Sequence, residues 1–264
     1  MRFDVITLFP ELFAPFLSAG INRRAFETGA VELKLWQLRD YADGTYRRVD
    51  DRPFGGGPGM VLLAEPLEKC LQAIRHDRAL KNPYEKPVPV VLFSPIGQPL
   101  NHAGVEEWSQ SDGAILICGR YEGLDQRFID AHVDVQVSLG DFVLSGGEIA
   151  AIALLDAVAR LQPGVLNDEG SHQMDSFNPA LDGLLDCGHF TRPEVWKDIT
   201  VPPVLMSGHH AEITKWRRQQ SLVLTQKYRP DLIVGARLAG KLSTQDENFL
   251  FSLSASGLVE SKSN

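Results

Sequence analysis

The 264-residue chain lacks any apolar run near the ~20 residues that a membrane span requires. Its N-terminus, MRFDVITLFPELF, carries Asp4 and Glu11 and lacks the basic flank and small-residue cleavage site of a signal peptide. Three cysteines, Cys70, Cys118 and Cys187, stand far apart with no CxxC spacing, which argues against a disulfide framework and a zinc site. We therefore expect a protein of the reducing cytoplasm.

Common phosphate-binding motifs are also missing. Neither GxGxxG nor GxxxxGK[ST] occurs, so a ligand cradled by its phosphates is disfavoured. Low-complexity segments and internal repeats are absent, and 44% hydrophobic with 23% charged residues is ordinary for a globular protein. The chain is long enough to bury a sizeable core in one or two domains.

Basic residues are fewer than acidic residues in the whole chain, but they outnumber the acidic residues in one segment. The net charge is -8, and residues 1–166 hold 16 basic and 22 acidic side chains. Residues 187–229 instead hold seven Lys and Arg against three Asp and Glu, with three histidines. Such a basic segment can bind nucleic acid despite the negative total, although a solvated basic helix would give the same asymmetry.

Short β-rich runs recur in the first part of the chain. They begin at Phe3, Val31, Val88, Ala114 and Val133. Helix-compatible stretches at 64–76 and 102–110 lie between them, and this alternation predicts a parallel α/β sheet. An apolar helix from Glu148 ends at Pro163 and Gly164.

The remainder of the chain differs in kind. Residues 167–183 are polar and aperiodic, which predicts a flexible linker between a domain at 1–166 and one at 184–264. The stretch from His209 places Ile213, Trp216, Val223 and Leu224 near one helical face, so the second domain is predicted to be small and helical.

Three of the predicted strands lead into glycine-bearing turns, SPIGQPL, GRYEGLD and SLGDFVLSGGE. In open parallel sheets ligands bind beyond the carboxyl ends of strands, so these loops could line one cleft, although each alone could be an ordinary connection. Backbone groups and apolar walls suit an adenosine without phosphates, such as S-adenosylmethionine. Glu122 could face its positive sulfonium and amino groups; alternatively, Glu122 pairs with Arg120.

Residues 50–60, DDRPFGGGPGM, contain four glycines and two prolines, which predicts a segment without regular secondary structure. The segment is either a shaped binding loop or a plain connection.

Together these segments resemble the bacterial tRNA (guanine-N1)-methyltransferase family of the SPOUT superfamily. The resemblance rests on VDDRPFGGGPGM, LFSPIG, CGRYEGLDQR, SLGDFVLSGGE, DSF, LLDCGHFTRPE and VPPVLMSGHHAEI, in family order over about residues 1–228. It implies an α/β fold, a SPOUT-type parallel sheet with a trefoil knot, plus a smaller α-helical C-terminal domain. It also implies a homodimer with active sites shared between subunits, which methylates N1 of guanosine 37 in the anticodon stem-loop of tRNA.

By the same resemblance, the S-adenosylmethionine site spans the three glycine-bearing loops. Its residues are Leu92, Ser94, Pro95, Gly97, Gly119, Tyr121, Glu122, Leu139, Gly140, Phe142, Leu144, Gly146 and Gly147.

Catalytic roles are implied for Asp175 and Arg160. Guanine N1 carries a proton that must leave for methylation, so a base is required, and the Asp175 carboxylate can accept from N1–H and the exocyclic amine. Arg160 would stabilise negative charge growing on O6, although Asp156, four residues earlier, could instead pair with it on a helix.

Substrate contacts are implied for the 50–60 loop and for the basic second domain. These residues are Asp50, Arg52, Gly55, Gly56, Gly57, Phe177, His189, Arg192, Lys215, Arg217 and Arg218. A purely structural role for His189 and Arg192 is equally open. Mg²⁺ could bridge carboxylate and RNA oxygens, with Asp168 and Glu169 as weak candidates, but no ligand spacing demands a metal.

Two other functions are open at this stage. The same fold could methylate a different RNA nucleotide, or it could bind RNA without turnover. The second alternative predicts loss of Asp175, Arg160 or the glycine cleft, and this chain retains all three.

Overall fold

The computed structural model describes residues 1–84, 86–166 and 171–255. The chain divides into two compact units, Met1–Asn167 and Asp168–Asn264. Within the described residues, no helix is both long and apolar enough to cross a membrane.

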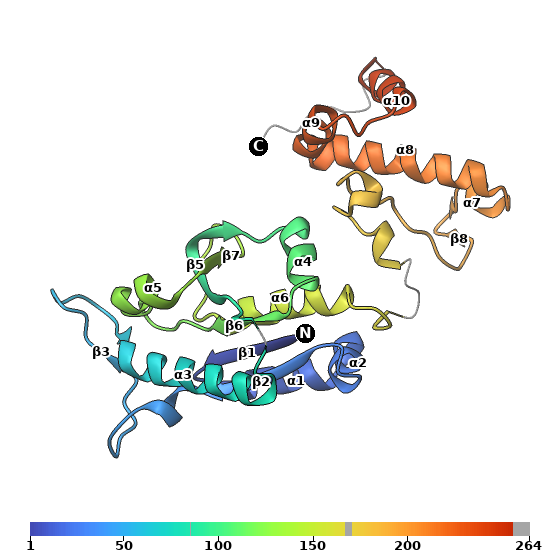
Figure 1. Ribbon diagram of the computed structural model, residues 1–264. Helices are drawn as coiled ribbons and strands as arrows, with labels where there is room; N and C mark the ends of the chain where they lie inside the picture. The colour runs from blue at the N-terminus through green and yellow to red at the C-terminus, as the bar shows by residue number, and fades with distance from the viewer. Residues whose placement is uncertain (85, 167–170, 256–264) are drawn as a thin grey trace. The chain divides into compact units, whose positions relative to one another are not determined.

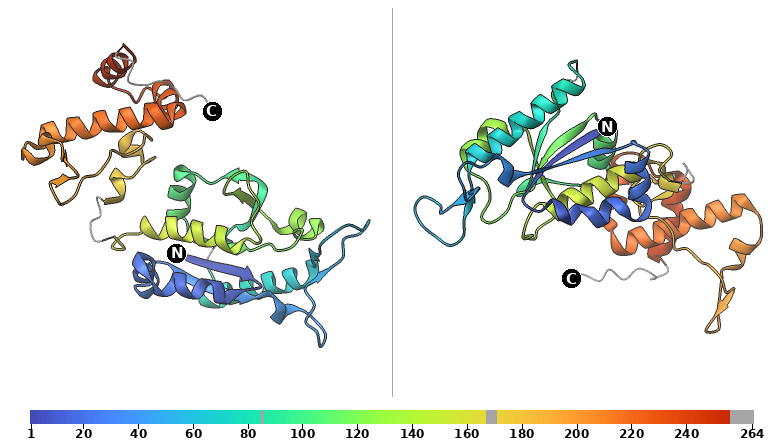
Figure 2. Two further views of the ribbon diagram at one scale, coloured as in Figure 1. Left: turned by 180° about the vertical axis from the view of Figure 1, so that it is seen from behind. Right: turned by 90° about the horizontal axis from the view of Figure 1, so that it is seen from below.

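The first unit is built on a five-stranded parallel sheet in the order β2-β1-β6-β5-β7 (Figure 1). Its strands are β1 (Arg2–Thr7), β2 (Glu32–Gln37), β5 (Val90–Pro99), β6 (Gly113–Ile117) and β7 (Val135–Ser138). All five predicted strands are present, which confirms the predicted parallel α/β sheet. Every residue of the central strands β1 and β6 is buried because helices cover both faces of the sheet (Figure 2).

Helices pack on the two faces to form separate apolar cores. One core joins the sheet to α1 (Ala14–Ser18), α2 (Gly20–Glu27), α4 (His102–Ser109) and α6 (Glu148–Arg160), and the preceding turn η1 (Pro10–Phe13) adds Phe13. The other core joins it to α3 (Ala64–Lys81), α5 (Gln126–His132) and the turn η2 (Leu38–Tyr41). The predicted helices at 64–76, 102–110 and from Glu148 are therefore confirmed.

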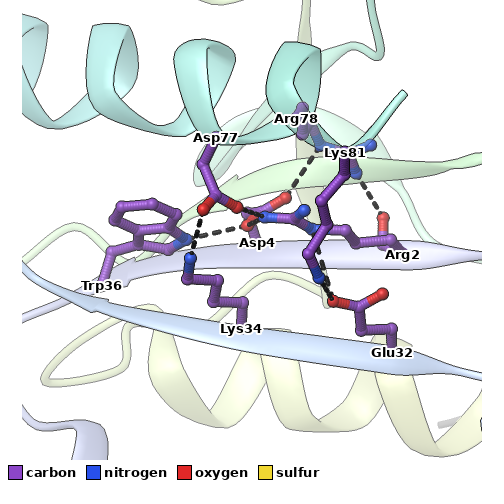
Figure 3. A network of polar contacts seen from close by, with 8 residues as sticks. All are labelled: Arg2, Asp4, Glu32, Lys34, Trp36, Asp77, Arg78 and Lys81. Carbon is purple, nitrogen blue, oxygen red and sulfur yellow. Dashed lines mark hydrogen bonds and ion pairs between the residues drawn. The ribbon is translucent and has the colours of Figure 1, made fainter. Parts of the chain in front are cut away.

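A network of charged side chains lies between α3 and the sheet (Figure 3). Asp4 is fully buried, and its carboxylate accepts hydrogen bonds from Arg2 (2.6 Å), Trp36 Nε1 (2.8 Å) and Arg78 (2.8 Å). Arg2 also donates to Asp77 at 2.7 Å. A buried carboxylate is tolerated only with such partners, so the network holds α3 on β1 by compensating the desolvation of Asp4.

One predicted turn is wrong. SPIGQPL was expected to follow its strand as a turn, but β5 continues to Pro99 with an irregularity between Phe93 and Gln98. After this irregularity Gln98 and Pro99 pair again with β7, opposite Val137 and Ser138. The renewed pairing supplies backbone hydrogen bonds that a free turn would lack.

The 50–60 segment is the tip of a hairpin. The two-residue strands β3 (Asp50–Asp51) and β4 (Val61–Leu62) pair antiparallel, and residues 52–60 connect them. β4 is anchored to the loop after β6, because Leu62 N donates to Gly123 O at 2.9 Å and Asp125 N donates to Leu62 O at 3.0 Å.

The second unit contains α8 (His210–Tyr228), α9 (Pro230–Leu238) and α10 (Thr244–Ala255), preceded by short elements. The short elements are η3 (Ser171–Met174), η4 (Pro179–Leu181), β8 (Val195–Trp196), β9 (Ile199–Thr200) and α7 (Pro203–Met206). Its core joins Leu184 and Leu222 to apolar residues of α9 and α10.

The most buried face of α8 differs from the predicted one. Ser221, Leu222 and Thr225 are buried, whereas Val223 is only partly buried. Two of these buried residues, Ser221 and Thr225, are polar, and each forms a hydrogen bond with the backbone of Leu185. The Ser221 hydroxyl donates to the Leu185 carbonyl, and the Thr225 hydroxyl accepts from the Leu185 N–H. Apolar periodicity alone misses a face completed by hydrogen-bonded hydroxyls.

Part of the predicted linker can be described. Residues 167–170, which include the weak candidates Asp168 and Glu169, lie outside the described residues. Residues 171–183 include η3 and η4, and Leu181 is buried. The linker and domain boundaries stay predictions.

Candidate active site

A cavity of about 420 Å³ lies at the irregularity of β5, between Phe93 and Gln98, and at the loops that follow β6 and β7. Among the residues lining it are twelve of the thirteen predicted for the cofactor. These are Leu92, Ser94, Pro95, Gly119, Tyr121, Glu122, Leu139, Gly140, Phe142, Leu144, Gly146 and Gly147. The fold thus brings three segments, distant in sequence, around one space: the irregular part of β5 and the loops after β6 and β7.

Gly97 is the predicted residue that does not line this cavity; it borders a neighbouring pocket with Gly104 and Trp108. A Cβ built on Gly97 would lie 2.5 Å from the backbone carbonyl carbon of Gln136. The close approach of β5 to β7 therefore accounts for glycine at this position.

The loops after β6 and β7 are packed directly on each other. Gly147 N donates to Gly119 O at 2.9 Å, and Gly146 forms an antiparallel bridge with Arg120. A Cβ on Gly147 would lie 2.8 Å from Cys118 Cα, and one on Gly146 would lie 2.2 Å from Arg120 Nε. These two glycines permit the contact between loops that shapes the cavity wall.

Arg120 pairs with Glu148 rather than with Glu122. Its guanidinium lies 2.9 Å from the buried Glu148 carboxylate, donates to Ser145 O at 3.2 Å and lies over the ring of Phe9. Glu148 also accepts from the Thr7 hydroxyl at 2.8 Å. The alternative of an Arg120–Glu122 pair is wrong, because Arg120 pairs with the buried carboxylate of Glu148.

Glu148 was not predicted as a functional residue. It begins α6 directly after the LSGG turn, so its place at the start of a helix was the available signal. Through Arg120 and Thr7 it connects β1, the loop after β6 and the loop before α6.

Glu122 lies where the cavity meets the 50–60 loop. A Cβ on Gly59 would lie 2.3 Å from Glu122 Oε1, and Glu122 N donates to Met60 O at 3.0 Å. In the part of the chain that the structure describes, no ion pair holds the Glu122 carboxylate. The acid is thus kept at the cavity wall by packing and backbone contacts.

The tip of the 50–60 loop is solvent-exposed. Gly55, Gly56 and Gly57 all have positive φ, and Phe54 is fully exposed. Below the tip, Asp51 accepts from Arg48 (2.8 Å) and from the backbone N–H of Arg52 (2.7 Å). The neighbouring Asp50 is half-buried in β3.

The two predicted catalytic residues belong to different units. Arg160 is the last residue of α6 in the first unit, where Asp156 accepts a hydrogen bond from Asn22. Asp175 follows η3 in the second unit; its side chain is half-buried, and its backbone carbonyl accepts from Asn178 N at 3.2 Å.

The substrate residues predicted in the second unit fall into two groups. Arg192, Lys215 and Arg217 are exposed, and in the described ranges no acidic side chain pairs with them. Arg218 instead contacts the carboxylates of Asp182 (2.7 Å) and Asp246 (3.0 Å). Burial opposes the charge on Arg218, but these two carboxylates raise its pKa above the ordinary value.

His189 and Phe177 have local partners. His189 Nε2 lies 2.9 Å from Asp186 Oδ2, and the Arg229 guanidinium lies 5.8 Å from the centre of the Phe177 ring. Phe177 has φ +72, a left-handed conformation that side chains rarely adopt. Across the described residues, no group of three or more His, Cys, Asp or Glu side chains is arranged to hold a metal.

Comparison with known proteins identifies the family. The family model described as tRNA (guanine-1)-methyltransferase TrmD matches residues 1–235. The chain is 70% identical over 253 residues to the tRNA (guanine-N(1)-)-methyltransferase of Polaromonas sp., covering 96% of this chain and 97% of that protein. It is 67% identical over 253 residues to the same enzyme of Paracidovorax citrulli, covering 96% and 98%. The chain therefore belongs to the tRNA (guanine-1)-methyltransferase family, TrmD.

Proposed function

We propose that this protein transfers the methyl group of S-adenosylmethionine to N1 of guanosine 37 in tRNA. Family membership and relatives named tRNA (guanine-N(1)-)-methyltransferase support the reaction class. The observation that carries the proposal is the cavity, because the irregular part of β5 and the loops after β6 and β7 surround it with backbone, apolar side chains and one acid.

The cavity fits the cofactor in size and chemistry. Its volume of about 420 Å³ lies within the range of ~300–1,000 Å³ usual for small-molecule sites. Leu92 and Leu144 offer apolar walls for an adenine, and Glu122 offers a negative charge for a sulfonium or an amino group. When bound, S-adenosylmethionine supplies an electrophilic methyl group.

Asp175 is proposed as the base. Its carboxylate would accept the proton of guanine N1 while N1 attacks the methyl carbon, and it would also accept a hydrogen bond from the exocyclic amine. Arg160 would stabilise the negative charge that develops on O6. The bond between N1 and the methyl carbon would form as the sulfonium–methyl bond breaks, with S-adenosylhomocysteine as the leaving group. Because the N1 proton moves to Asp175, the methylated guanine is neutral.

Asp50, Arg52 and the glycines of the 50–60 loop are proposed to bind the target nucleotide. The contact of Gly59 with Glu122 supports this role, because it joins the loop to the cavity wall. Positive φ at Gly55 to Gly57 exposes backbone that a base can approach. A target taken out of its stack would enter beside this loop.

The basic residues of the second unit are proposed to bind tRNA phosphates. Of the seven Lys and Arg residues in 187–229, Arg218 and Arg229 pair with carboxylates. The other five make no ion pair among the described residues: Arg192, Lys197, Lys215, Arg217 and Lys227. Cations that pair with no carboxylate in the described part of the chain are available to neutralise a phosphate backbone, whereas Arg218 has an internal role.

We further propose that the first unit contains the SPOUT trefoil knot and that the protein forms a homodimer with active sites shared between subunits. We also propose that the protein is located in the cytoplasm, where its tRNA substrate is found. The direct packing of the loop at Gly147 on that at Gly119 supports an interlocked arrangement. Mg²⁺ is proposed only as an ion shared with RNA oxygens.

The test is methyl transfer to an unmodified tRNA transcript with guanosines at positions 36 and 37, followed by separation of the product nucleosides. Wild type should yield 1-methylguanosine at position 37. Asp175→Asn should be at least about 100-fold slower with S-adenosylmethionine binding intact, because general-base catalysis contributes about 10²–10⁴-fold. Glu212→Gln, which changes an exposed acid of α8, should leave the rate unchanged.

Other outcomes separate the alternatives. Equal rates for wild type and Asp175→Asn would eliminate Asp175 as the base. A product at another nucleotide would favour a different RNA target. Binding of tRNA without S-adenosylmethionine binding or turnover would favour a non-catalytic RNA-binding protein.

A further inference from the structure

The β8–β9 hairpin is a surface element that the proposed transfer site does not use. Trp196 pairs opposite Ile199, and Val195 pairs opposite Thr200. Directly opposed residues of an antiparallel pair project from the same face, so Trp196 and Ile199 form one small apolar face. The indole is 59% exposed and Ile199 is 65% exposed.

A cation stands beside this face. Lys197 Nζ lies 4.8 Å from the centre of the Trp196 ring, and Lys197 makes no ion pair among the residues that the structure describes. An exposed aromatic ring in contact with an ammonium group that pairs with no described carboxylate offers stacking for a base and charge for its phosphate.

The hairpin turn places a lysine, Lys197, in a left-handed conformation that favours Gly, Asn or Asp. Lys197 and Asp198 have φ values of +48 and +61, as in a type I′ turn, where Asn-Gly is the favoured pair. Side chains with a Cβ cost energy in this region. A lysine at this position therefore points to a use for its side chain.

The segment that leads into the hairpin contacts the helix that carries proposed tRNA-binding residues. The rings of Phe190 and Trp216 are in contact, with centroids 6.0 Å apart, and so connect the segment before β8 to α8. On α8, Lys215 and Arg217 are exposed. The apolar face consists of two opposed side chains beside a lysine. A face of this size matches a single base, whereas each partner in a stable protein interface buries ~800 Å².

We infer that Trp196 stacks on an unpaired base of the tRNA while Lys197 neutralises an adjoining phosphate. This inference rests on the proposed function and adds a specific contact to it. RNA is commonly recognised through unstacked bases placed on aromatic side chains, and the proposed target region is a loop.

The test measures binding of the unmodified tRNA transcript to the full-length protein at fixed salt. Trp196→Ala should raise Kd roughly 5- to 100-fold, the effect of removing one stacked base. Trp196→Phe should retain most of the affinity, whereas Trp196→Leu should behave like Ala because it lacks an aromatic face. Tyr84→Ala removes an aromatic ring of the first unit that is 95% exposed, more than Trp196 at 59%, and should change nothing.

Two further readouts make the test specific. Lys197→Gln should reduce the slope of log K against log salt by about one phosphate contact. Affinity for S-adenosylmethionine without tRNA should be the same in every hairpin variant, and an unchanged circular dichroism spectrum and unfolding transition should show that the second unit of each variant is folded.

Contrary results are distinct. If Trp196→Ala binds tRNA as wild type does, the stacking contact is refuted while the methyltransferase stands. If Trp196→Leu restores binding, or if Trp196→Ala lowers the molar mass in light scattering, the hairpin contacts protein instead. If wild type neither binds nor methylates tRNA, the proposed function fails together with this inference.

Discussion

Gly59 and Glu122 occupy adjoining space, so that a Cβ on the glycine would lie 2.3 Å from the glutamate Oε1. This contact joins the tip of the β3–β4 hairpin to the wall of the cavity. It makes the position of the Glu122 carboxylate depend on a residue more than sixty positions earlier in the chain.

Gly59→Ala should weaken S-adenosylmethionine binding by about 10- to 100-fold, because displacing Glu122 removes one charge-assisted contact. Gly56→Ala is the matched control. Both glycines have positive φ, +82 and +77, but nothing lies within 4 Å of a Cβ on Gly56. Isothermal titration without tRNA measures the effect, and equal losses in both variants would assign it to backbone strain.

The buried Arg120–Glu148 pair should be important for stability. Arg120→Met leaves the Glu148 carboxylate buried without its cation and should lower the free energy of unfolding by about 3–5 kcal/mol. The double variant Arg120→Met/Glu148→Gln should be less destabilised than the sum of the two single variants. Urea unfolding gives the values; additive losses would show that the two side chains act independently.

Asp77 should make the first unit sensitive to acid. Hydrogen bonds from Lys34 and Arg2 lower the pKa of Asp77 to about 2, from an ordinary 3.8. A carboxylate whose pKa is lower in the folded state stabilises the protein above its unfolded pKa, and this contribution is lost as pH falls from about 4 towards 2. Asp77→Asn should therefore be less stable than wild type at pH 7, with the difference shrinking over that window.

Thermal unfolding at a series of pH values tests this expectation. Glu11→Gln, which changes an exposed acid with no ion pair in the described ranges, should keep the wild-type pH dependence. A constant gap between Asp77→Asn and wild type down to pH 2 would contradict the role of Asp77.

Neighbouring arginines of α8 should have opposite phenotypes. Arg218→Ala removes the partner of Asp182 and Asp246 and should destabilise the second unit by about 2–4 kcal/mol. Arg217→Ala should change stability by less than about 0.5 kcal/mol but weaken tRNA binding and lower its salt dependence. Unfolding and filter-binding experiments on the same two proteins distinguish these roles, and a loss of tRNA affinity confined to Arg218→Ala would reverse the assignment.

Local sequence patterns were sufficient for much of the fold. The five β-rich runs became the five strands of one parallel sheet, and the apolar stretch from Glu148 became α6, which ends before Pro163. The SPIGQPL segment was misassigned, because a strand that resumes after an irregularity carries the same Gly and Pro residues as a turn.

The candidate site was predicted less completely. Glycines after strands indicated the cavity loops, but they did not distinguish Gly97, which packs on β7, from Gly140, which lines the cavity. Lysines and arginines on α8 looked alike in sequence, although Arg218 is committed to two carboxylates and Arg217 is not.

The sequence alone determined the strand and helix periodicity, the absence of phosphate-binding motifs and the segments that resemble the family. Each of these features depends on residues close together in the chain. Tertiary structure decided which loops meet, that Arg120 pairs with Glu148 instead of Glu122, and that Gly59 abuts Glu122. The physical reason is that burial and ion pairing depend on neighbours in space. A carboxylate selects its partner by depth and distance, and neither is encoded in local spacing.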